Sequence, residues 1–525
     1  MSILDEIVEK RRADIARFGY TFACDIPAAR KRKAPVPFVA QKGAVLEVKR
    51  ASPSKGDIAP ALDAAATATT YAAAGAAAIS VLTEKNYFKG SLVDLMAVCA
   101  AVDAYAESHE GSLCPAVLRK DFLLAPEEVD IAYRAGADAV LLIARLLEKD
   151  VLLKMAERCA ELGMTAFIEL RLDEDVQKLA FVAERVDSEH IVCGVNARDL
   201  RDFSIDLLTP AGMLPKIQRA AGQNVRVIFE SGIRTPEAAS FAGGLGFTGM
   251  LLGEAAARNP AQAAALVESF VNARQTAHTK AWLDYAHVLA EENLPRPLVK
   301  ICGLTNMEDV LAVLLTDAMF LGFIFCAKSP RNVDASVVRE ARAVLSRMTA
   351  EEEGDSALKQ FPKLVGIIID CESAEAKTAL ALAREGVLDF IQLHGERAVE
   401  QFFSTPALQD LPHYAVVNVS SEEDIAKLDA LRERGEPRIL IDAVSGGLIG
   451  GTGTQIAASL VSQIRKKTRL WLAGGVTPEN ARNIIEDFEP ELIDVASGVE
   501  EAPGRKDLEK LDALFACIAP AEAEV

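Results

Sequence analysis

One pattern repeats along the whole chain and limits its fold more than any other feature. A short apolar run, often rich in β-branched residues, ends at a polar residue or a glycine, and a stretch with helical periodicity follows it. In the first half we expect strands at 45–49, 78–82, 116–119, 139–143, 165–169, 191–196, 226–230 and 250–252. In the second half we expect them at 298–302, 320–325, 364–369, 390–393, 414–419, 439–442, 470–473 and 492–495. Apolar strands that alternate with helices indicate parallel pairing with both faces buried.

The number of repeats distinguishes two α/β architectures. A doubly wound sheet stops at about five to seven strands, whereas eight strand–helix units close into a (β/α)8 (TIM) barrel of about 250 residues. The chain has 525 residues, which is enough for two such barrels. We therefore predict an α/β protein made of two tandem TIM barrels.

The boundary between the barrels is marked by a change in pattern. Residues 261–292 have helical periodicity, and Pro295 and Pro297 follow on either side of an arginine. Proline interrupts a helix and is tolerated just before a strand. We predict a first barrel over 1–262, a connector over 263–297 and a second barrel over 298–525.

Charge and cysteine content exclude several classes of function. The chain carries 57 Lys and Arg against 76 Asp and Glu, a net charge of −19, and such a surface repels nucleic acid. A small phosphorylated ligand is still compatible with a locally basic pocket. The nine cysteines form no CxxC pair, which argues against a zinc ribbon and indicates reduced thiols.

Neither a signal peptide nor a membrane span is expected. Residues 1–12 are charged and amphipathic and lack an apolar core with a cleavage site. The longest apolar run, 71–82, is shorter than the roughly 20 residues that a span requires. We expect a cytoplasmic protein without membrane partners.

Polar residues that end the strands of the first half are the candidates for chemistry, because strand ends of a barrel converge on one mouth. These candidates are Glu47, Lys49, Lys120, Glu169 and Asn196. A single lysine of this kind is more often part of a surface salt bridge, but convergence from several strands favours a site. Lysines beside carboxylates in a closed pocket suit general acid–base catalysis.

The last two strands of the first half end in glycine-containing turns, where barrels commonly bind phosphate through backbone N–H groups. These turns supply Ser231, Gly232 and Gly253. Ser231 is also a candidate helix N-cap, a role compatible with phosphate binding.

The first half resembles indole-3-glycerol-phosphate synthases over roughly residues 1–260. The matching segments are Leu46-Glu47-Val48-Lys49-Arg50-Ala51-Ser52-Pro53-Ser54-Lys55-Gly56, Ile79–Glu84 with Tyr87–Ser91, Leu118-Arg119-Lys120-Asp121-Phe122 and Gly194-Val195-Asn196-Ala197-Arg198-Asp199-Leu200. These motifs are long and are not general to barrels. The resemblance implies a ring closure of 1-(2-carboxyphenylamino)-1-deoxyribulose 5-phosphate to indole-3-glycerol phosphate, with loss of CO2 and water.

The same resemblance implies roles for individual residues. Lys120 is the general acid that polarises the ketone, and Glu169, with Lys49 and Glu47, serves the dehydration. Asn196 and Arg198 position the ring and carboxylate, and Phe122 stacks near the anthranilate ring. Ser52, Ser231, Gly232 and Gly253 line the substrate and phosphate sites. Glu254 departs from family members that have serine beside the phosphate loop, so its carboxylate should turn away from the phosphate.

The second half has a cysteine and an aspartate at strand ends. Cys302 ends the first strand and Asp442 the sixth, so the two can face each other across the mouth. A single cysteine is usually an inert core residue, whereas a buried aspartate at a strand end is rare without a function. A thiolate base opposite a carboxylic acid suits proton transfer between neighbouring carbons. Glycine-rich segments follow at 450–453, 473–476 and 496–500, a moderate indication of phosphate binding.

The second half resembles phosphoribosylanthranilate isomerases over roughly residues 298–517. The matching segments are Lys300-Ile301-Cys302-Gly303, Ser329-Pro330-Arg331, Gln392-Leu393-His394-Gly395, Ile441-Asp442-Ala443, Gly450-Gly451-Thr452-Gly453 and Ser497–Glu500 with Pro503–Asp507. The implied reaction is an Amadori rearrangement of N-(5-phosphoribosyl)anthranilate.

This resemblance also implies roles. Asp442 is the general acid, Cys302 is the general base, and Arg331 holds the anthranilate carboxylate. Gly451, Gly453, Gly474, Gly475, Ser497 and Gly498 form the substrate and phosphate site. His394 stays outside the catalytic set. Thr454 stands where family members usually have lysine, so backbone N–H groups must bind the phosphate there.

Taken together, the two resemblances imply a multifunctional enzyme of tryptophan biosynthesis, a lyase (decarboxylase) joined to an isomerase. Its substrates are small phosphorylated anthranilate derivatives, and neither reaction implies a metal or an organic cofactor. A monomer is compatible with this organisation. The alternatives are a different phosphosugar barrel enzyme, such as an epimerase or aldolase, which needs a metal cluster or a Schiff-base lysine, and a pair of degenerate barrels acting as a scaffold, which predicts loss of the strand-end residues.

Overall fold

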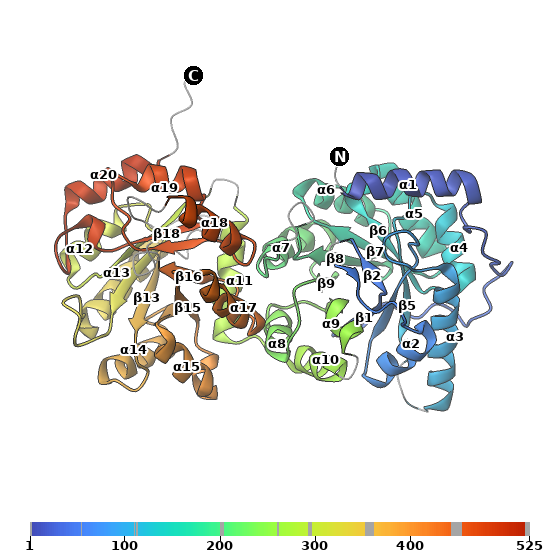
Figure 1. Cartoon of the computed structure of the whole chain (residues 1–525), viewed down its shortest axis with the longest axis horizontal. Helices are drawn as coiled ribbons and strands as arrows, with labels where there is room; N and C mark the ends of the chain where they lie inside the picture. Colours follow the sequence, from blue (N-terminus) through green and yellow to red (C-terminus); the bar gives the residue numbers. More distant parts are fainter. Residues whose placement is uncertain are drawn as a thin grey trace, which may run out of the picture. The chain divides into compact units, whose positions relative to one another are not determined.

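Each half of the chain forms its own closed barrel of eight parallel strands, which confirms the predicted fold (Figure 1). The computed structural model describes residues 3–53, 55–109, 111, 114–199, 204–259, 262–291, 294, 297–351, 362–442 and 454–519. The chain divides into two units, Met1–Arg274 and Gln275–Val525. No helix among the described residues is long and apolar enough to cross a bilayer.

In the first unit the barrel closes where β10 pairs with β1. Its strands are β1 (Gly43–Val48), β4 (Ala78–Leu82), β5 (Ala116–Lys120), β6 (Ala139–Ile143), β7 (Thr165–Leu170), β8 (Ile191–Asn196), β9 (Arg226–Glu230) and β10 (Gly249–Leu252). Its helices are α1 (Ile3–Phe18), α2 (Ala64–Ala73), α3 (Leu92–Ser108), α4 (Glu127–Ala135), α5 (Lys149–Glu161), α6 (Asp173–Ala183), α7 (Thr209–Ala221), α8 (Pro236–Gly244), α9 (Glu254–Arg258) and α10 (Ala263–Asn272).

The interior of the first barrel is filled with apolar side chains below the mouth. Val45, Leu118, Phe167 and Ile228 come from different strands and belong to one buried cluster. Phe38, which precedes β1, packs on Phe167 with ring centroids 5.5 Å apart and closes the amino end. The polar strand ends therefore lie above a packed core.

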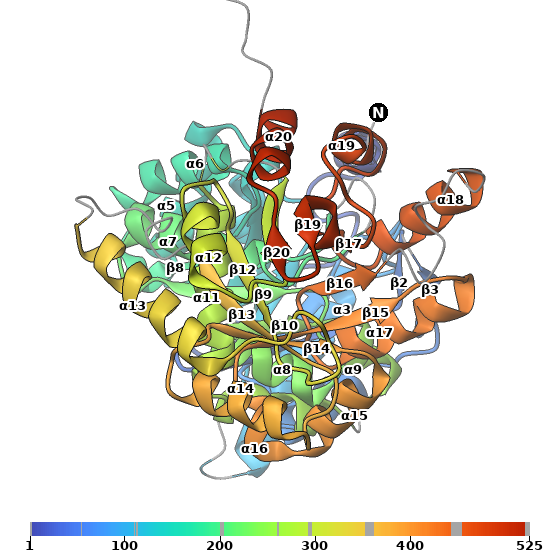
Figure 2. The same ribbon diagram turned by 90° about the vertical axis from the view of Figure 1, so that its left-hand side faces the viewer.

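The second unit repeats the design in simple sequence order, with β18 pairing back to β11. Its strands are β11 (Leu298–Cys302), β12 (Phe320–Ile324), β13 (Lys363–Ile368), β14 (Phe390–His394), β15 (His413–Asn418), β16 (Ile439–Asp442), β17 (Trp471–Ala473) and β18 (Leu492–Val495). Its helices are α11 (Ala277–Leu289), α12 (Met307–Leu314), α13 (Ala335–Glu351), α14 (Ala374–Arg384), α15 (Glu396–Ser404), α16 (Pro406–Gln409), α17 (Ile425–Glu433), α18 (Thr454–Arg465), α19 (Ala481–Phe488) and α20 (Leu508–Ile518). Figure 2 shows helices of this unit around its strands.

Helix α11 closes the amino end of the second barrel. Its Trp282 packs against Phe390 and Trp471, with ring centroids 5.2 and 5.9 Å apart. Phe390 and Trp471 are the first residues of their strands, so this aromatic cluster lies opposite the mouth. The segment predicted as a connector is thus divided: α10 belongs to the first unit and α11 to the second.

Two short hairpins were not foreseen from the sequence. Strands β2 (Ala51–Ser52) and β3 (Gly56–Asp57) pair after β1, and β19 (Glu500–Ala502) and β20 (Arg505–Lys506) pair after β18. Both hairpins follow the carboxyl end of a barrel strand, where the candidate sites lie. All nine cysteines are free thiols.

Candidate functional site

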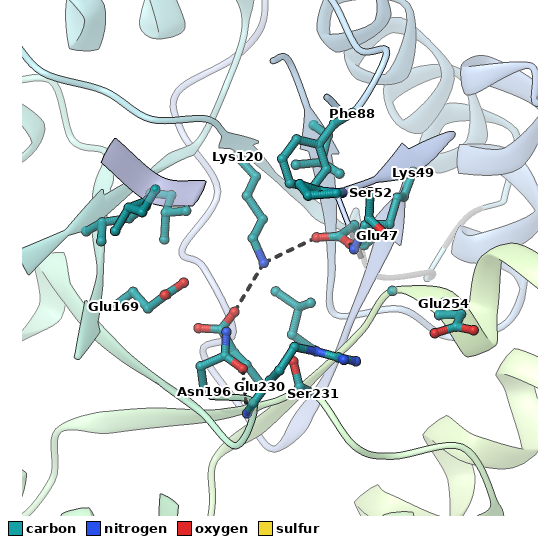
Figure 3. A pocket seen from close by; sticks show the side chains of 18 of the residues that line it. Glu47, Lys49, Ser52, Phe88, Lys120, Glu169, Asn196, Glu230, Ser231 and Glu254 are labelled. Carbon is teal, nitrogen blue, oxygen red and sulfur yellow. Dashed lines mark hydrogen bonds and ion pairs between the residues drawn. The ribbon is translucent and has the colours of Figure 1, made fainter. Parts of the chain in front are cut away.

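The strand ends of the first barrel bring five polar side chains to one cavity of about 230 Å³. Glu47, Lys120, Glu169, Asn196 and Glu230 come from β1, β5, β7, β8 and β9 (Figure 3). Ser52, Phe122, Arg198, Ser231, Gly232 and Gly253 line the same cavity, as does Lys49. Every site residue predicted for this half therefore lies at one place.

Lys120 is held between two carboxylates. Its Nζ lies 3.2 Å from Glu47 Oε2 and 3.1 Å from Glu230 Oε2, while Lys49 Nζ lies 2.6 Å from Glu47 Oε1. Burial disfavours charge on both partners, but the carboxylates raise the pKa of Lys120 above its ordinary value. The two ammonium groups lower the pKa of Glu47 to about 2. The site thus holds a charged ammonium directly at the cavity.

Glu169 differs from the other carboxylates of the cavity. Burial raises its pKa to about 8, and repulsion from Glu230 acts in the same direction. A carboxyl group that titrates near neutral pH can both give and take a proton during catalysis. Glu169 thus has a pKa that suits proton transfer near neutral pH.

Two glycines make room for the charged side chains. A Cβ at Gly253 would lie 2.6 Å from Glu47 Oε1 and 3.2 Å from Lys49 Nζ. A Cβ at Gly194, on β8, would lie 2.3 Å from Glu230 Oε1. Any larger residue at these positions would displace a carboxylate that contacts Lys120.

The turn after β9 has the backbone expected of an anion-binding loop. Ser231 and Gly232 both have left-handed backbone, with φ of 72° and 87°, and successive residues of this kind can point their N–H groups to one side. Arg198 and Arg234 also line the cavity. Glu254 lines it too, but its carboxylate is paired with Arg258 at 3.2 Å.

Sequence reasoning missed several residues of this cavity. Glu230 was not among the predicted site residues, although it ends β9 at the same mouth. Arg234 and Phe88 come from loops, and Leu4 and Ile7 come from α1. The amphipathic character of residues 1–12 was a signal that this helix packs on something, but not on what.

In the second barrel the two predicted catalytic residues end their strands. Cys302 ends β11 and is 7% exposed, and Asp442 ends β16. His394, which ends β14, lies near Asp442, and burial lowers its pKa. Arg331 is paired with Glu500 at 2.6 Å. A Cβ at Gly303 would lie 2.8 Å from Arg331 Cδ, so this glycine admits the arginine beside Cys302.

Two of the three glycine-rich segments predicted in the second half lie within the described residues. Gly474 and Gly475 follow β17 with φ of 95° and 68°. Ser497 and Gly498 follow β18, and a Cβ at Gly498 would lie 1.9 Å from the carbonyl oxygen of Val476. Gly451 and Gly453 lie outside the described residues, and Thr454 is the first residue of α18.

Among the described residues, one group of potential metal ligands comes together that sequence spacing did not indicate. Ligand atoms of His278, His413 and Glu436 lie within 4.8 Å of one another, all buried. The two imidazole rings stack with centroids 4.0 Å apart, and His413 Nε2 lies 2.9 Å from Glu436 Oε1. Imidazole lone pairs lie in the ring plane, so stacked rings do not converge on one ion. The group packs α11 onto the amino end of β15, away from the mouth.

Family models match both halves of the chain. Residues 4–268 match the model described as indole-3-glycerol phosphate synthase, and residues 299–516 match that of N-(5'phosphoribosyl)anthranilate (PRA) isomerase. The chain belongs to the bifunctional synthase–isomerase family of tryptophan biosynthesis. The synthase domain comes first and the isomerase domain second, as the motifs predict.

Whole-chain relatives agree with this domain order. The tryptophan biosynthesis protein TRP1 of Phytophthora nicotianae is 30% identical over 98% of this chain and 96% of its own length. The tryptophan biosynthesis protein TrpCF of Yersinia pestis is 30% identical over 90% of this chain and 83% of its own. The multifunctional tryptophan biosynthesis protein of Schizosaccharomyces pombe is 32% identical over 89% of this chain, which spans 58% of that longer protein.

Proposed function

We propose that the second barrel isomerises N-(5-phosphoribosyl)anthranilate to 1-(2-carboxyphenylamino)-1-deoxyribulose 5-phosphate, and that the first barrel converts this product to indole-3-glycerol phosphate. The ring closure releases CO2 and water. The observation that carries the proposal is the placement of Lys120 between Glu47 and Glu230 at a cavity that Glu169 also lines.

In the isomerase barrel, Asp442 protonates the oxygen of the furanose ring as the bond from that oxygen to C1′ breaks. Cys302 as a thiolate then removes the proton from C2′, and the resulting enolamine tautomerises to the ketone. No atom is lost, so an acid and a base are sufficient. Arg331 binds the anthranilate carboxylate, for which it must exchange some contact with Glu500.

The phosphate of the isomerase substrate binds at the glycine turns after β17 and β18. Gly474, Gly475, Ser497 and Gly498 supply backbone N–H groups, and we propose that Gly451 and Gly453 complete the site. Left-handed glycines after barrel strands are suited to this task, because no side chain blocks the approach of the anion.

In the synthase barrel, Lys120 donates a hydrogen bond and then a proton to the ketone oxygen while the aromatic carbon attacks C2′. Loss of the carboxyl group as CO2 restores the aromatic ring. The hydroxyl group then leaves as water, with Glu169 as the main proton-transfer group and with Lys49 and Glu47 beside it. The pKa of Glu169, about 8, is near the pH at which such transfer is efficient.

Other residues of the cavity position the synthase substrate. Asn196 and Arg198 orient the ring and its carboxylate, and the Asn196 side chain accepts a hydrogen bond from the Arg198 backbone at 3.0 Å. Phe122 packs against the ring, with Phe88 6.2 Å away between ring centroids. Ser52, Ser231, Gly232 and Gly253 surround the phosphate.

A coupled assay tests the whole proposal. The purified chain is given phosphoribosylanthranilate generated in situ, with a chelator present, and both loss of that substrate and formation of the indole are followed. We expect indole-3-glycerol phosphate to accumulate without added metal. Substrate loss without indole would contradict the synthase half. No change at all, together with failure to convert the ribulose phosphate intermediate, would contradict both halves.

Two further measurements test the aldolase alternative and the oligomeric state. Borohydride reduction in the presence of substrate should leave Lys120 unmodified, whereas an aldolase would trap a Schiff base there. We further propose a monomer that acts in the cytoplasm, and light scattering of the eluted peak from a sizing column gives the mass that tests the monomer.

A further inference from the structure

Beneath Cys302 lies a buried ion pair that the proposed mechanism does not use. Lys300 is two residues before Cys302 on β11, so both side chains point to the same side of the strand, into the barrel. Lys300 Nζ lies 2.6 Å from Asp494 Oδ2, on β18, and 2.9 Å from Gln392 Oε1, on β14. Lys300 is only 1% exposed and Asp494 only 7%. Substrate at the mouth cannot reach this lysine directly.

The thiol of Cys302 rests on this ion pair. The ammonium group of Lys300, fixed by Asp494, lies on the same face of β11 as the thiol, and its charge acts to lower the pKa of that thiol. Gly322, on the neighbouring strand β12, closes the other side, because a Cβ there would lie 2.8 Å from Cys302 Sγ. The thiol is therefore fixed between a cation below and a glycine beside it.

The other polar groups around Cys302 are directed elsewhere. Lys506 Nζ donates to the backbone carbonyl of Cys302 at 2.6 Å and is paired with Glu500 at 3.2 Å. Arg331 is paired with the same glutamate. Tyr414 donates its hydroxyl hydrogen to Gln392 at 2.8 Å. Lys506 and Arg331 are thus held by Glu500, whereas Lys300 is held below the thiol by Asp494 and Gln392.

We propose that Lys300 is a positioning residue for the isomerase: its buried ammonium group stabilises the thiolate of Cys302, and Asp494 fixes the place of that ammonium group. This inference deepens the proposed function, because it rests on Cys302 acting as the general base.

The electrostatics support this role. Burial raises the pKa of the Cys302 thiol, and the nearby ammonium of Lys300 is the strongest influence in the opposite direction. Asp494 acts with burial and against Lys300. A lysine next to a cysteine is a known way to favour the thiolate. Removing the lysine and neutralising the aspartate should therefore have opposite effects on the same thiol.

The test compares Lys300→Met with Asp494→Asn in the full chain. Both variants break the same buried ion pair, so general damage to the core should be similar in both. The measured quantity is the pH at which alkylation of Cys302 by iodoacetamide reaches half its maximal rate, read by mass spectrometry of the Cys302 peptide. Cys326, half-buried on the next strand–helix connection, is quantified in parallel as the comparison.

We expect the half-point for Cys302 to rise by about 1–3 pH units in Lys300→Met, since an opposite charge at close range shifts a pKa by that amount. We expect it to fall in Asp494→Asn and to stay near the wild-type value in Lys300→Arg, which keeps the charge. Shifts in the same direction for the first two variants, or none in either, would overturn the proposal.

Two controls distinguish a true shift in Cys302 reactivity from unfolding of the variant and from failure of the proposed function. The chain's two tryptophans, Trp282 and Trp471, both belong to the second unit, so their fluorescence reports whether that barrel is folded. If Lys300→Met does not fold, Lys300→Gln, which also removes the charge but keeps a polar group against Asp494, is compared with Asp494→Asn in the same way. Isomerase activity of Cys302→Ala is measured separately, because retained activity would refute the base and not the Lys300 contact.

Discussion

In the first barrel the buried lysine ends its strand, while in the second it lies two residues below the strand end. The Lys120 side chain is 15% exposed and reaches the cavity, whereas that of Lys300 is 1% exposed and supports Cys302 from beneath. Both lysines are paired with carboxylates of other strands, and in both the pairing raises the lysine pKa. The same barrel thus gives a lysine a direct or an indirect role according to its depth along the strand.

The largest expected effect is that of replacing the exposed lysine. Lys120→Met should lower synthase turnover by about 10⁴-fold, since it removes both the proton donor and the charge that polarises the ketone. Isomerase turnover of the same preparation serves as the internal control and should not change. Synthase activity within about tenfold of wild type would remove Lys120 from the direct role.

The matching change in the second barrel targets its acid. Asp442→Asn keeps the shape of the side chain but cannot donate the proton, and we expect isomerase turnover to fall by about 10²–10³-fold. Synthase activity, measured with the ribulose phosphate intermediate, should be that of wild type. If Asp442→Asn keeps normal isomerase turnover, the acid is another group.

A pH effect on stability distinguishes the first barrel from the second. The folded-state pKa of Glu169 is raised from 4.5 to about 8, so between these values the folded chain keeps a proton that the unfolded chain releases. The stability that neutral Glu169 contributes is fully present below pH 4.5 and is lost as the pH rises through about 8.

The measurement compares wild type with Glu169→Gln in urea unfolding followed by circular dichroism. As the pH rises from about 5 to about 8, the free energy of unfolding of wild type should fall relative to that of Glu169→Gln. Above about pH 8 the difference between the two should stay constant. Tryptophan fluorescence, which follows the second unit only, should show no such difference. A difference that does not depend on pH would contradict the raised pKa.

The smallest effects are expected from replacing two glycines that leave room for the side chains of Glu47 and Cys302. Gly253→Ala pushes on Glu47, and Gly322→Ala pushes on the Cys302 thiol. Overpacking of this kind costs about 1–3 kcal/mol. Each variant should lower the turnover of its own barrel about tenfold or more and leave the other reaction unchanged. Equal losses of both reactions in either variant would argue against independent sites.

The barrels and most of the site could be predicted from the sequence because a closed barrel fixes where strand ends lie. Once the first, third, fifth and sixth strands of the first half are recognised, Glu47, Lys120, Glu169 and Asn196 must share a mouth. The same argument brought Cys302 and Asp442 to one end of the second barrel. The apolar pattern of a strand determines which of its side chains point into the barrel, and this pattern is visible in a short segment of sequence.

Contacts made by elements outside the barrels could not be predicted in this way. The packing of α1 over the first cavity depends on tertiary contacts, such as the ion pairs of Arg11 with Asp121 and Glu128 on the β5–α4 connection and its helix. The stack of His278 on His413 likewise joins residues far apart in the sequence. Lys300 was quoted within a motif, but its burial beneath Cys302 follows only from the closed barrel.

The central claim is that two independent sites, one in each barrel, catalyse the two reactions in succession. The most direct test mixes equal amounts of Cys302→Ala and Lys120→Met with phosphoribosylanthranilate and follows indole-3-glycerol phosphate. Neither variant alone should form the indole, and the mixture should form it after a lag while the ribulose phosphate intermediate accumulates. A mixture that forms no indole, although each variant keeps its one remaining activity, would contradict the account.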